Sequence, residues 1–336
     1  MKLLVLGGTR FLGRHLVQQA LDAGHEVTLL HRGRSGPGLF PQAEHLVADR
    51  NGDLGVLAHG HWDAAIDTSA YVPRHVHTVA AALAGRVGQY QLVSTISVYA
   101  DPNAPGTTED APLAALADPQ AEAVTGDTYG GLKALCEAAA MEGFEGRCLV
   151  SRPGLIVGPH DPTGRFTWWV QRMARGAAGG PVLAPGEPEA QVQFIDARDA
   201  AAWMLRQAEQ GHVGTFNLSG PEEPLTMRGL LDSARTALGN PAPLVWVDED
   251  FLLAQGVGPW MELPLWLPRA QGGLLQVDIT RALDTGLVCR PLAQTVLDTA
   301  AWAASAPPAP ADAPPRPAVG LAPEREAALL AAWQAR

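Results

Sequence analysis

Residues 2–13 read KLLVLGGTRFLG, a short apolar run that passes through a glycine-rich turn into an amphipathic stretch. The run over residues 2–6 predicts a buried strand, and Leu12, Leu16 and Ala20 mark one face of a helix over residues 11–23. A tight turn between a strand and a helix lets the backbone approach a pyrophosphate closely and presents free amides at the helix start. The stretch therefore predicts a dinucleotide-binding loop rather than an ordinary Gly-Gly turn. The expected cofactor contacts are Gly7, Thr9, Arg10, Phe11, Leu12 and Gly13.

Strands and helices alternate through the first half of the chain. Apolar runs predict further strands over residues 26–30, 45–48, 64–67, 91–94 and 148–152. Helical spacing of apolar residues predicts helices over residues 73–84 and 127–142. Such alternation is typical of βαβ units, so we expect an α/β protein with a Rossmann-type, doubly wound parallel sheet.

The pattern changes after about residue 153, where glycine, proline and tryptophan become frequent and the alternation is lost. We therefore predict an NAD(P)-binding domain over residues 1–155. A smaller C-terminal substrate-binding lobe is predicted over residues 156–304, with a few of its elements interleaved with the sheet of the first domain.

The last part of the chain is predicted to leave the lobe and return to it. Six prolines fall within residues 307–317, so residues 305–322 are expected to form an extended connector. A proline at position 323 suits the first turn of a helix, which we place over residues 323–336. Its Leu329, Leu330 and Trp333 share one face, which we expect to dock on the body of the protein.

Composition narrows the class of protein. The chain has 336 residues, of which 47% are hydrophobic and 18% charged, as expected of a globular protein with more than one lobe. Its formal net charge of −11 argues against nucleic acid as a partner, because an acidic protein is repelled by a phosphate backbone. The three cysteines are too scattered for a disulfide framework or a metal cluster, and no apolar run approaches a membrane span. We expect a cytoplasmic protein without a metal site.

The end of the second predicted strand bears on the choice of cofactor. An NAD site usually has an acidic residue at this point, which binds the ribose 2′-hydroxyl, whereas arginine suits a 2′-phosphate. Here the sequence is His31-Arg32-Gly33-Arg34, so we expect NADP to be preferred to NAD through Arg32 and Arg34. The alternative is that both arginines are solvated. Asp49, after the third strand, either reaches the adenine amino group or forms a turn.

Tyr129 and Lys133 stand four residues apart, and hence on one face of a predicted helix. A tyrosine pKa is ordinarily about 10, and a nearby ammonium favours the phenolate. The pair therefore suits acid/base chemistry near neutral pH, with the lysine also able to hold a nicotinamide ribose.

Several further segments support a family resemblance. They are Ser94-Thr95-Ile96-Ser97-Val98-Tyr99, Arg152-Pro153-Gly154 with Val157-Gly158-Pro159, Phe194-Ile195-Asp196-Ala197-Arg198-Asp199, and Phe216-Asn217-Leu218. Together with the glycine-rich loop and the Tyr-x-x-x-Lys pair, they make the chain resemble an extended or atypical short-chain dehydrogenase/reductase of the NAD-dependent epimerase/dehydratase family. The resemblance covers roughly residues 1–220.

The resemblance implies a catalytic triad of Thr95, Tyr129 and Lys133, with Ser94 and Ser97 as alternatives to Thr95. It also implies that the loop after the fourth strand and the segment after the sixth lie near the cofactor. The cofactor residues implied in this way are Thr68, Ser69, Ala70, Ser94, Tyr129, Lys133, Pro153 and Ile156.

Three departures from the usual family pattern matter. Arg10 replaces a glycine of the loop, a variant found in isoflavone reductase-like members and in chloroplast stem-loop RNA-binding proteins. The 4,6-dehydratases carry Asp-Glu after the triad threonine, where this chain has Ile96-Ser97, so dehydration by that route is not expected. Leu155 stands where sugar-nucleotide epimerases commonly have asparagine, which weakens a nucleotide-sugar assignment.

These observations predict an NAD(P)-dependent reductase or epimerase that acts on a carbonyl or carbinol centre of a small molecule. A sugar nucleotide is one candidate substrate, and a homodimer is left open. The alternative is a protein that keeps the fold without turnover, as a nucleotide sensor or an RNA-binding protein. The Thr95, Tyr129 and Lys133 set favours the enzyme.

Overall fold

A seven-stranded parallel sheet forms the core of the first half of the protein, in a computed structural model that describes residues 1–36, 38–118, 120–306 and 318–336. The strand order is β11-β6-β5-β4-β1-β2-β3, and every neighbouring pair is parallel. The strands are β1 (Lys2–Leu6), β2 (Glu26–His31), β3 (Glu44–Val47), β4 (Trp62–Asp67), β5 (Val87–Val93), β6 (Cys148–Pro153) and β11 (Gly214–Leu218). The predicted doubly wound α/β fold is confirmed.

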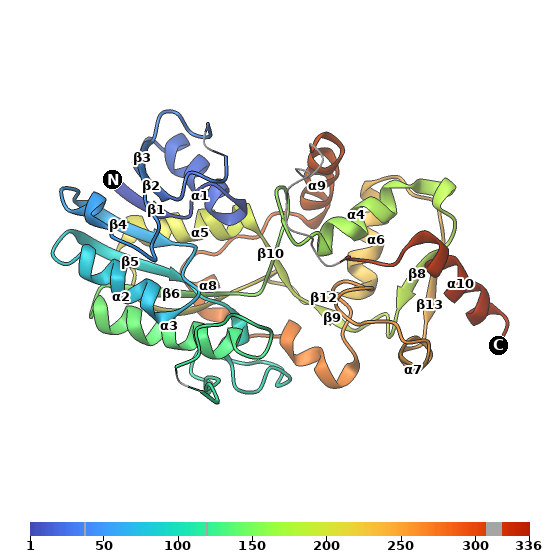
Figure 1. Cartoon of the computed structure of the whole chain (residues 1–336). Helices are drawn as coiled ribbons and strands as arrows, with labels where there is room; N and C mark the ends of the chain where they lie inside the picture. Colours follow the sequence, from blue (N-terminus) through green and yellow to red (C-terminus); the bar gives the residue numbers. More distant parts are fainter. Residues whose placement is uncertain (37, 119, 307–317) are drawn as a thin grey trace.

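Helices cover both faces of this sheet (Figure 1). α1 (Phe11–Asp22) and α5 (Ala197–Gln210) pack together on one face, and α2 (Pro73–Ala82) and α3 (Tyr129–Gly143) pack together on the other. Successive side chains of a strand point to opposite faces. Accordingly, the residues of β1 divide between two buried clusters, with Leu3 facing the α1 side and Leu4 the α2 side. Burial on both faces explains why β1 is apolar from Leu3 to Leu6.

A second, smaller body is built from the later part of the chain, on the right of Figure 1. Its helices are α4 (Arg165–Ala174), α6 (Met227–Ala237), α7 (Glu249–Ala254), α9 (Leu292–Ser305) and α10 (Pro323–Gln334). Its short strand pairs are β8 (Val182–Pro185) with β13 (Leu244–Val247), and β9 (Gln191–Val192) with β12 (Leu225–Thr226). Trp169, Trp266 and Phe166 are buried in its apolar core.

The two bodies are joined by more than one crossing of the chain. β7 (Leu155–Val157) pairs in parallel with β10 (Phe194–Asp196) between them, and β11 then returns to the large sheet beside β6. The remaining short elements are α8 (Thr280–Asp284) and the 3-10 helices η1 (Gly55–Leu57), η2 (Ile96–Val98), η3 (Gly176–Gly179) and η4 (Arg269–Leu275). Nowhere in the described residues is a helix both long and apolar enough to cross a membrane.

The predicted elements of the first half agree with the structure except at their ends. The helix predicted over residues 127–142 begins at Tyr129, because residues 125–128 form a turn in which Thr125 and Thr128 hydrogen-bond each other. The helix predicted from residue 323 is present as α10, with Leu329 and Leu330 buried. The proline-rich segment over residues 307–317 lies outside the described residues.

A buried ion pair anchors α10 to the second body. Arg172 of α4 donates from Nε to Glu326 of α10 at 2.7 Å, and both side chains are almost fully buried. The other Glu326 oxygen accepts the Leu183 amide at 3.1 Å, so the carboxylate also holds β8. The charge of Glu326 is thus balanced inside the protein by one arginine.

Arg172→Met should lower the free energy of unfolding by about 3–5 kcal/mol, because it leaves the Glu326 carboxylate buried without its cation. The double variant Arg172→Met/Glu326→Leu should recover much of this loss. Urea unfolding would measure both, with Arg269→Met as the control, since its pair with Glu187 is exposed and worth about 1 kcal/mol at most. An unchanged midpoint in Arg172→Met would contradict the anchoring role.

Candidate functional site

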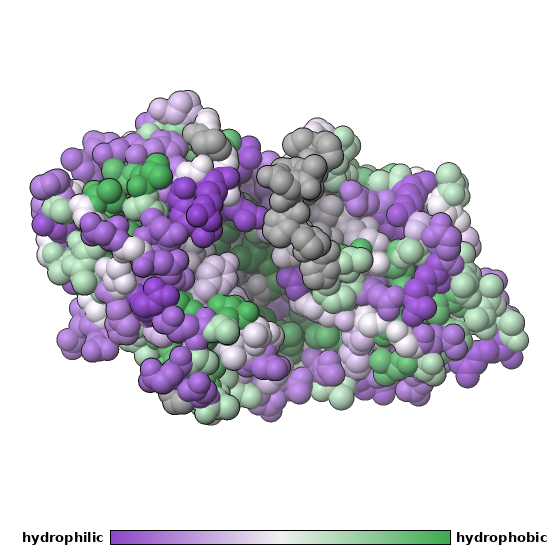
Figure 2. Space-filling model, viewed as in Figure 1, coloured by the Kyte–Doolittle hydropathy of each residue, from purple (hydrophilic) through white to green (hydrophobic). Residues whose placement is uncertain are grey.

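A cavity of about 840 Å³ lies at the carboxyl ends of the sheet strands and is closed on its far side by the second body. Figure 2 shows the molecule hollowed between its two bodies. β1 and β4 are neighbours, and the chain winds away from them in opposite directions along the sheet. Parallel sheets bind ligands in the crevice that such a reversal of winding creates.

Every site residue predicted from the sequence lines this one cavity. From the first body these are Gly7, Thr9, Arg10, Phe11, Leu12, Gly13, Arg32, Arg34, Asp49, Thr68, Ser69, Ala70, Ser94, Thr95, Tyr129, Lys133, Pro153 and Ile156. The structure thus brings together residues from six strand ends and two helix starts. Whether each one contacts a ligand stays a prediction.

The glycine-rich loop needs its glycines for two different reasons. Gly7 has φ +93°, and a Cβ there would lie 2.7 Å from the Thr68 hydroxyl. Gly13 sits where a Cβ would come within 2.5 Å of the Gly7 carbonyl oxygen, so it lets α1 pack on the loop. Phe11 also has a positive φ of 38°, which is uncommon for a residue with a side chain. The loop is held in a conformation that leaves its backbone open to the cavity.

A buried ion pair fixes the neighbouring loop after β4. Arg50 donates to both oxygens of Asp67, at 3.0 and 2.5 Å, and Tyr90 donates to the same carboxylate at 2.9 Å. Burial alone would raise the pKa of Asp67, but the Arg50 cation and these hydrogen bonds lower it. Asp67 in turn accepts the Ser69 amide at 2.9 Å. Arg50 therefore positions the loop that carries Thr68, although the sequence did not single it out.

Cations gather at the end of the cavity formed by β2 and β3. Arg10, Arg32 and Arg34 line it, and all three side chains are exposed to the cavity or to solvent. Asp49 accepts both the backbone and the side-chain amide of Asn51, so it forms a turn. These hydrogen bonds, with a smaller contribution from Arg32 and Arg34, lower the pKa of Asp49. The carboxylate thus lies close to the two arginines.

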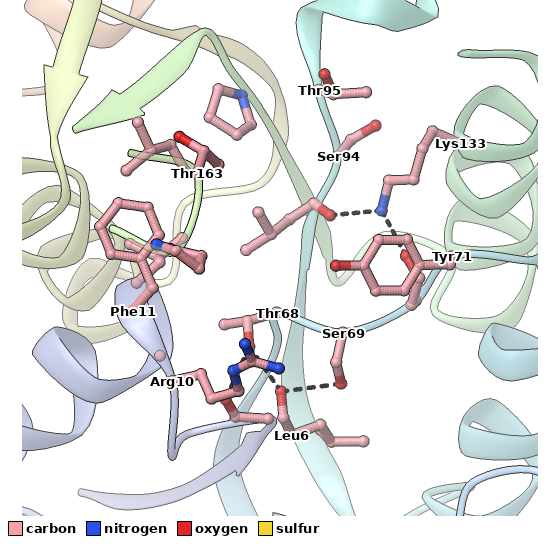
Figure 3. A pocket seen from close by; sticks show the side chains of 18 of the residues that line it. Leu6, Arg10, Phe11, Thr68, Ser69, Tyr71, Ser94, Thr95, Lys133 and Thr163 are labelled. Carbon is pink, nitrogen blue, oxygen red and sulfur yellow. Dashed lines mark hydrogen bonds between the residues drawn. The ribbon is translucent and has the colours of Figure 1, made fainter. Parts of the chain in front are cut away.

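At the other end of the cavity, Tyr129 begins α3, Lys133 follows one turn later, and Thr95 precedes η2. Lys133 is 3% exposed and donates from Nζ to the carbonyls of Ala70 and Val93 at 2.6 and 2.7 Å (Figure 3). Thr95 accepts the Ser97 amide at 3.1 Å and donates to the Ser97 hydroxyl at 3.2 Å. The phenol of Tyr129, the ammonium of Lys133 and the hydroxyls of Thr95 and Ser97 thus share one wall of the cavity, which we call the Tyr129 wall.

Burial dominates the titration of both α3 groups. It raises the pKa of Tyr129, which Thr95 and the Arg165 cation oppose, and it lowers the pKa of Lys133. The net change at Tyr129 is therefore opposite to the lowering expected from the Tyr-x-x-x-Lys spacing. The reason is that the Lys133 ammonium is turned to two main-chain carbonyls, whereas the phenol is surrounded by desolvating atoms.

Ser94 offers a polar atom to the cavity. Its hydroxyl is buried and, within the described part of the chain, has no hydrogen-bond partner. A buried hydroxyl without a partner costs free energy, so such a group usually serves a ligand or water. Its position between Val93, whose carbonyl binds Lys133, and Thr95 puts it beside the Tyr129 wall.

A network of buried polar groups lies behind this wall. Arg152 of β6 donates to Glu137 of α3 at 2.7 and 3.0 Å, and also to the Tyr99 hydroxyl at 3.1 Å. Tyr99 donates to Asn217, whose amide is accepted by Glu109 at 2.8 Å. The network fixes α3, and with it Lys133, against the sheet. The sequence had assigned no role to Glu109, and no local pattern marks it.

The second body supplies a set of lining residues that the sequence analysis missed. They are Pro162, Thr163, Arg165, Trp260, Leu274 and Leu275. They come from loops and helix ends that are distant in the sequence from Tyr129, so no local spacing could reveal them. No group of three or more potential metal ligands was found in the residues that the structure describes.

The sheet order and the glycine-rich loop together define a Rossmann-type α/β fold. The family model for the NAD dependent epimerase/dehydratase family matches residues 3–219, and the chain belongs to this family. This match indicates an NAD-dependent epimerase or dehydratase and does not distinguish between the two.

Individual relatives are more distant. The chloroplast stem-loop binding protein of 41 kDa b of Arabidopsis thaliana is 28% identical over 263 residues, which cover 72% of this chain and 64% of that protein. The match thus spans less than two thirds of the length of this curated relative.

Solved structures share the fold at low identity. A UDP-glucose 4-epimerase from Thermotoga maritima, solved with UDP-glucose, has a TM-score of 0.66 at 17% identity, covering 90% of this chain and 99% of that one. A UDP-glucuronic acid 4-epimerase from Bacillus cereus, solved with NAD, has a TM-score of 0.64 at 15% identity, covering 90% and 98%. A dTDP-glucose 4,6-dehydratase from Bacillus anthracis, also with NAD, has 0.65 at 16% identity, covering 91% and 97%.

Gly13→Ala should weaken cofactor binding, because its Cβ would press on the Gly7 carbonyl and displace the loop. Overpacking of this kind costs about 1–3 kcal/mol, which is roughly tenfold in the dissociation constant. Fluorescence titration with NADH and NADPH would measure it. Gly126→Ala is the matched control, since a Cβ there meets nothing within 4 Å. Unchanged affinity in Gly13→Ala would argue against a cofactor at this loop.

Proposed function

We propose that the protein is an NADP-dependent oxidoreductase or epimerase that acts on a carbonyl or carbinol centre of a small molecule, with Thr95, Tyr129 and Lys133 as its reacting set. The observation that carries the proposal is that these three side chains share one cavity with the glycine-rich loop. In this proposal, residues 1–155 hold the cofactor, and the substrate lobe over residues 156–304 closes the cavity over the substrate.

The residues of the cavity fit a nicotinamide dinucleotide. Gly7 and Gly13 let the loop pack tightly against Thr68 and the start of α1, where a Cβ would clash, and a loop of this kind at a helix start suits a pyrophosphate. The Ser94 hydroxyl on the Tyr129 wall finds no hydrogen-bond partner among the residues that the structure describes, and a ligand can supply one. Lys133 is held at the same wall and suits the binding of ribose hydroxyls. The volume of about 840 Å³ lies within the range of cofactor sites.

When bound, the nicotinamide supplies the uptake and return of a hydride. Tyr129 moves the accompanying proton: its phenol donates to a carbonyl oxygen, and its phenolate accepts from a carbinol hydroxyl. Thr95 orients the substrate oxygen by hydrogen bonding. Burial raises the pKa of Tyr129, so its side chain is a phenol near neutral pH and can act as the proton donor to a carbonyl oxygen.

Arg32 and Arg34 support the choice of NADP. Both line the end of the cavity beyond β2, where an acidic residue would bind the 2′-hydroxyl of NAD. The carboxylate that is close to them belongs to Asp49, which follows β3 rather than β2. It accepts hydrogen bonds from Asn51. The arginines are therefore available to a 2′-phosphate.

NADPH should bind more tightly than NADH by about tenfold or more, because a charge-assisted contact with the 2′-phosphate is worth roughly 1.5–3 kcal/mol. Arg32→Gln/Arg34→Gln should remove most of that preference and leave NADH binding unchanged. Fluorescence titration of both cofactors measures the ratio, with exposed Arg175→Gln as the control. Equal affinities in the unaltered protein would mean that the two arginines are only solvated.

Tyr129→Phe removes one hydroxyl and keeps the ring, so it should lower turnover by ~10²–10⁴ with little change in cofactor affinity. Lys133→Met should impair both turnover and cofactor binding, since its ammonium also serves the ribose. Cofactor oxidation with carbonyl compounds found by screening is the assay.

The same assay tests the alternative of a binding protein without turnover, which the name of the Arabidopsis relative brings forward for RNA. In that case Tyr129→Phe would change nothing measurable. The net charge of −11 speaks against RNA as a general partner.

A further inference from the structure

The second body places one cation in the cavity next to the Tyr129 wall. Arg165 is the first residue of α4 and lines the cavity. Burial raises the pKa of Tyr129, and the charge of Arg165 opposes this rise to a small extent, as expected of a cation that lines the same cavity. Figure 3 places Thr163, from the same loop, on the side of the cavity opposite Thr95 and Lys133. A cation in this position is close to wherever a substrate of Tyr129 lies.

Arg165 is poorly neutralised. Among the described residues its hydrogen bonding is limited to a long contact of 3.4 Å from Nε to Thr163, and no carboxylate forms an ion pair with it. Asp161 attracts it from a distance, but that carboxylate is occupied by the amide and hydroxyl of Thr163, at 2.7 and 3.0 Å. Burial lowers the pKa of Arg165, as expected of a cation that lacks a close partner.

The surroundings hold Arg165 in place without binding its charge. Its guanidinium lies 4.9 Å from the ring centre of Trp260, which restricts the side chain by a cation–π contact. Trp260 has φ +66° and donates its amide to the Trp266 carbonyl at 3.0 Å. A left-handed conformation at a bulky residue is strained, and such strain tends to persist at ligand sites.

Apart from the polar groups on the wall that carries Tyr129 and the hydroxyl of Thr163, this end of the cavity is mainly apolar. The lining near Tyr129 includes Ile96, Leu155, Leu274 and Leu275 beside Trp260. Asp49 is the one carboxylate among the described residues that line the cavity, and it lies near Arg32 and Arg34, at the end proposed for the cofactor. Of the described lining residues that come from the second body, Arg165 is the one with a positive charge. Because the carbonyls of Ala70 and Val93 engage the Lys133 ammonium, Arg165 is the cation at this end that suits one compact anionic group.

We propose that Arg165 binds a compact anionic group, a carboxylate or a phosphate monoester, that the substrate carries close to its reacting carbon. This rests on the function proposed above and names the substrate class of the same site. A nucleotide diphosphate would need several donors from the second body, and the lining offers Arg165 and the Thr163 hydroxyl. Arg165 is a specificity-determining residue: it selects anionic carbonyl compounds and holds them against Tyr129.

The test uses the full chain saturated with NADPH and four probes: glycolate, inorganic phosphate, ethylene glycol and UDP. Cofactor fluorescence or calorimetry reports the binding of each. Glycolate or phosphate should bind, and ethylene glycol, which has no charge, should not. Comparing the dissociation constants of glycolate and phosphate identifies whether the site prefers a carboxylate or a phosphate. Arg165→Gln should weaken anion binding roughly tenfold or more, and Arg165→Lys should restore part of it.

Arg175→Gln is the matched control, since Arg175 ends the same helix, is exposed and does not line the cavity. Arg165→Gln should leave the dissociation constant of NADPH unchanged and raise KM for anionic carbonyl substrates more than it lowers kcat. This separates it from Tyr129→Phe, which tests the acid/base proposal through kcat.

Three outcomes would overturn the inference. They are failure of both anions to bind, anion binding that Arg165→Gln leaves intact, and UDP binding that is tighter than that of either compact anion. None of the three would affect the cofactor titrations or the Tyr129→Phe result, so failure here is distinguishable from failure of the proposed function.

Discussion

The helix that carries Tyr129 and Lys133 is held to the sheet by a buried ion pair between Arg152 and Glu137. Both side chains are almost fully buried, so each charge depends on the other for the solvation that it loses. Arg152 also donates to the carbonyl of Glu109 at 2.8 Å, and Glu109 binds β11 through the amide of Asn217. A helix, a loop and two strands are thereby coupled at one guanidinium. Because these groups are buried, water cannot take the place of a lost partner, and this keeps the wall of the cavity in shape.

The cavity is electropositive in a protein whose net charge is −11. Arg10, Arg32 and Arg34 lie at one end, and Lys133 and Arg165 at the other. Arg50, which also lines the cavity, is neutralised by Asp67 and serves the loop instead. Charges of one sign within low-dielectric walls concentrate anions from solution. The distribution is consistent with an anionic cofactor at one end and an anionic substrate at the other, as proposed.

The second body is tied to the first by its own buried charges. Asp196, at the end of β10, is paired with Arg198 at 2.7 Å and accepts the Thr295 hydroxyl of α9 at 2.8 Å. Arg290 pairs with Asp199 of α5 at 2.7 Å. Burial alone would raise the pKa of Asp196, but the hydrogen bonds and charge of Arg198 lower it. These contacts link α5 on the sheet to α9 of the second body, and so fix how the second body faces the cavity.

Local patterns in the sequence were enough for the sheet, the glycine-rich loop and the Tyr129 helix. The spacing of apolar residues along a segment shows whether it is a helix or a strand and which faces it buries. The positive φ at the turn after β1 is marked by a single residue, Gly7. The same patterns collected eighteen residues that prove to line one cavity, because the carboxyl ends of parallel strands necessarily meet at one edge. The direction of the Tyr129 pKa was not accessible in this way, since it depends on how many atoms surround the phenol.

Arg165, Trp260 and Glu109 were also beyond the sequence. Each acts on residues that are far away along the chain, and a lone arginine, tryptophan or glutamate has no spacing that marks it. Only the packing of the second body against the strand ends decides that Arg165 lines the same cavity as Tyr129 and that no carboxylate pairs with it within the described residues. The sequence by itself determined the fold and the position of the glycine-rich loop, because both follow from short-range geometry. The tertiary structure decided what surrounds the reacting groups, because burial and charge are properties of everything that packs around them.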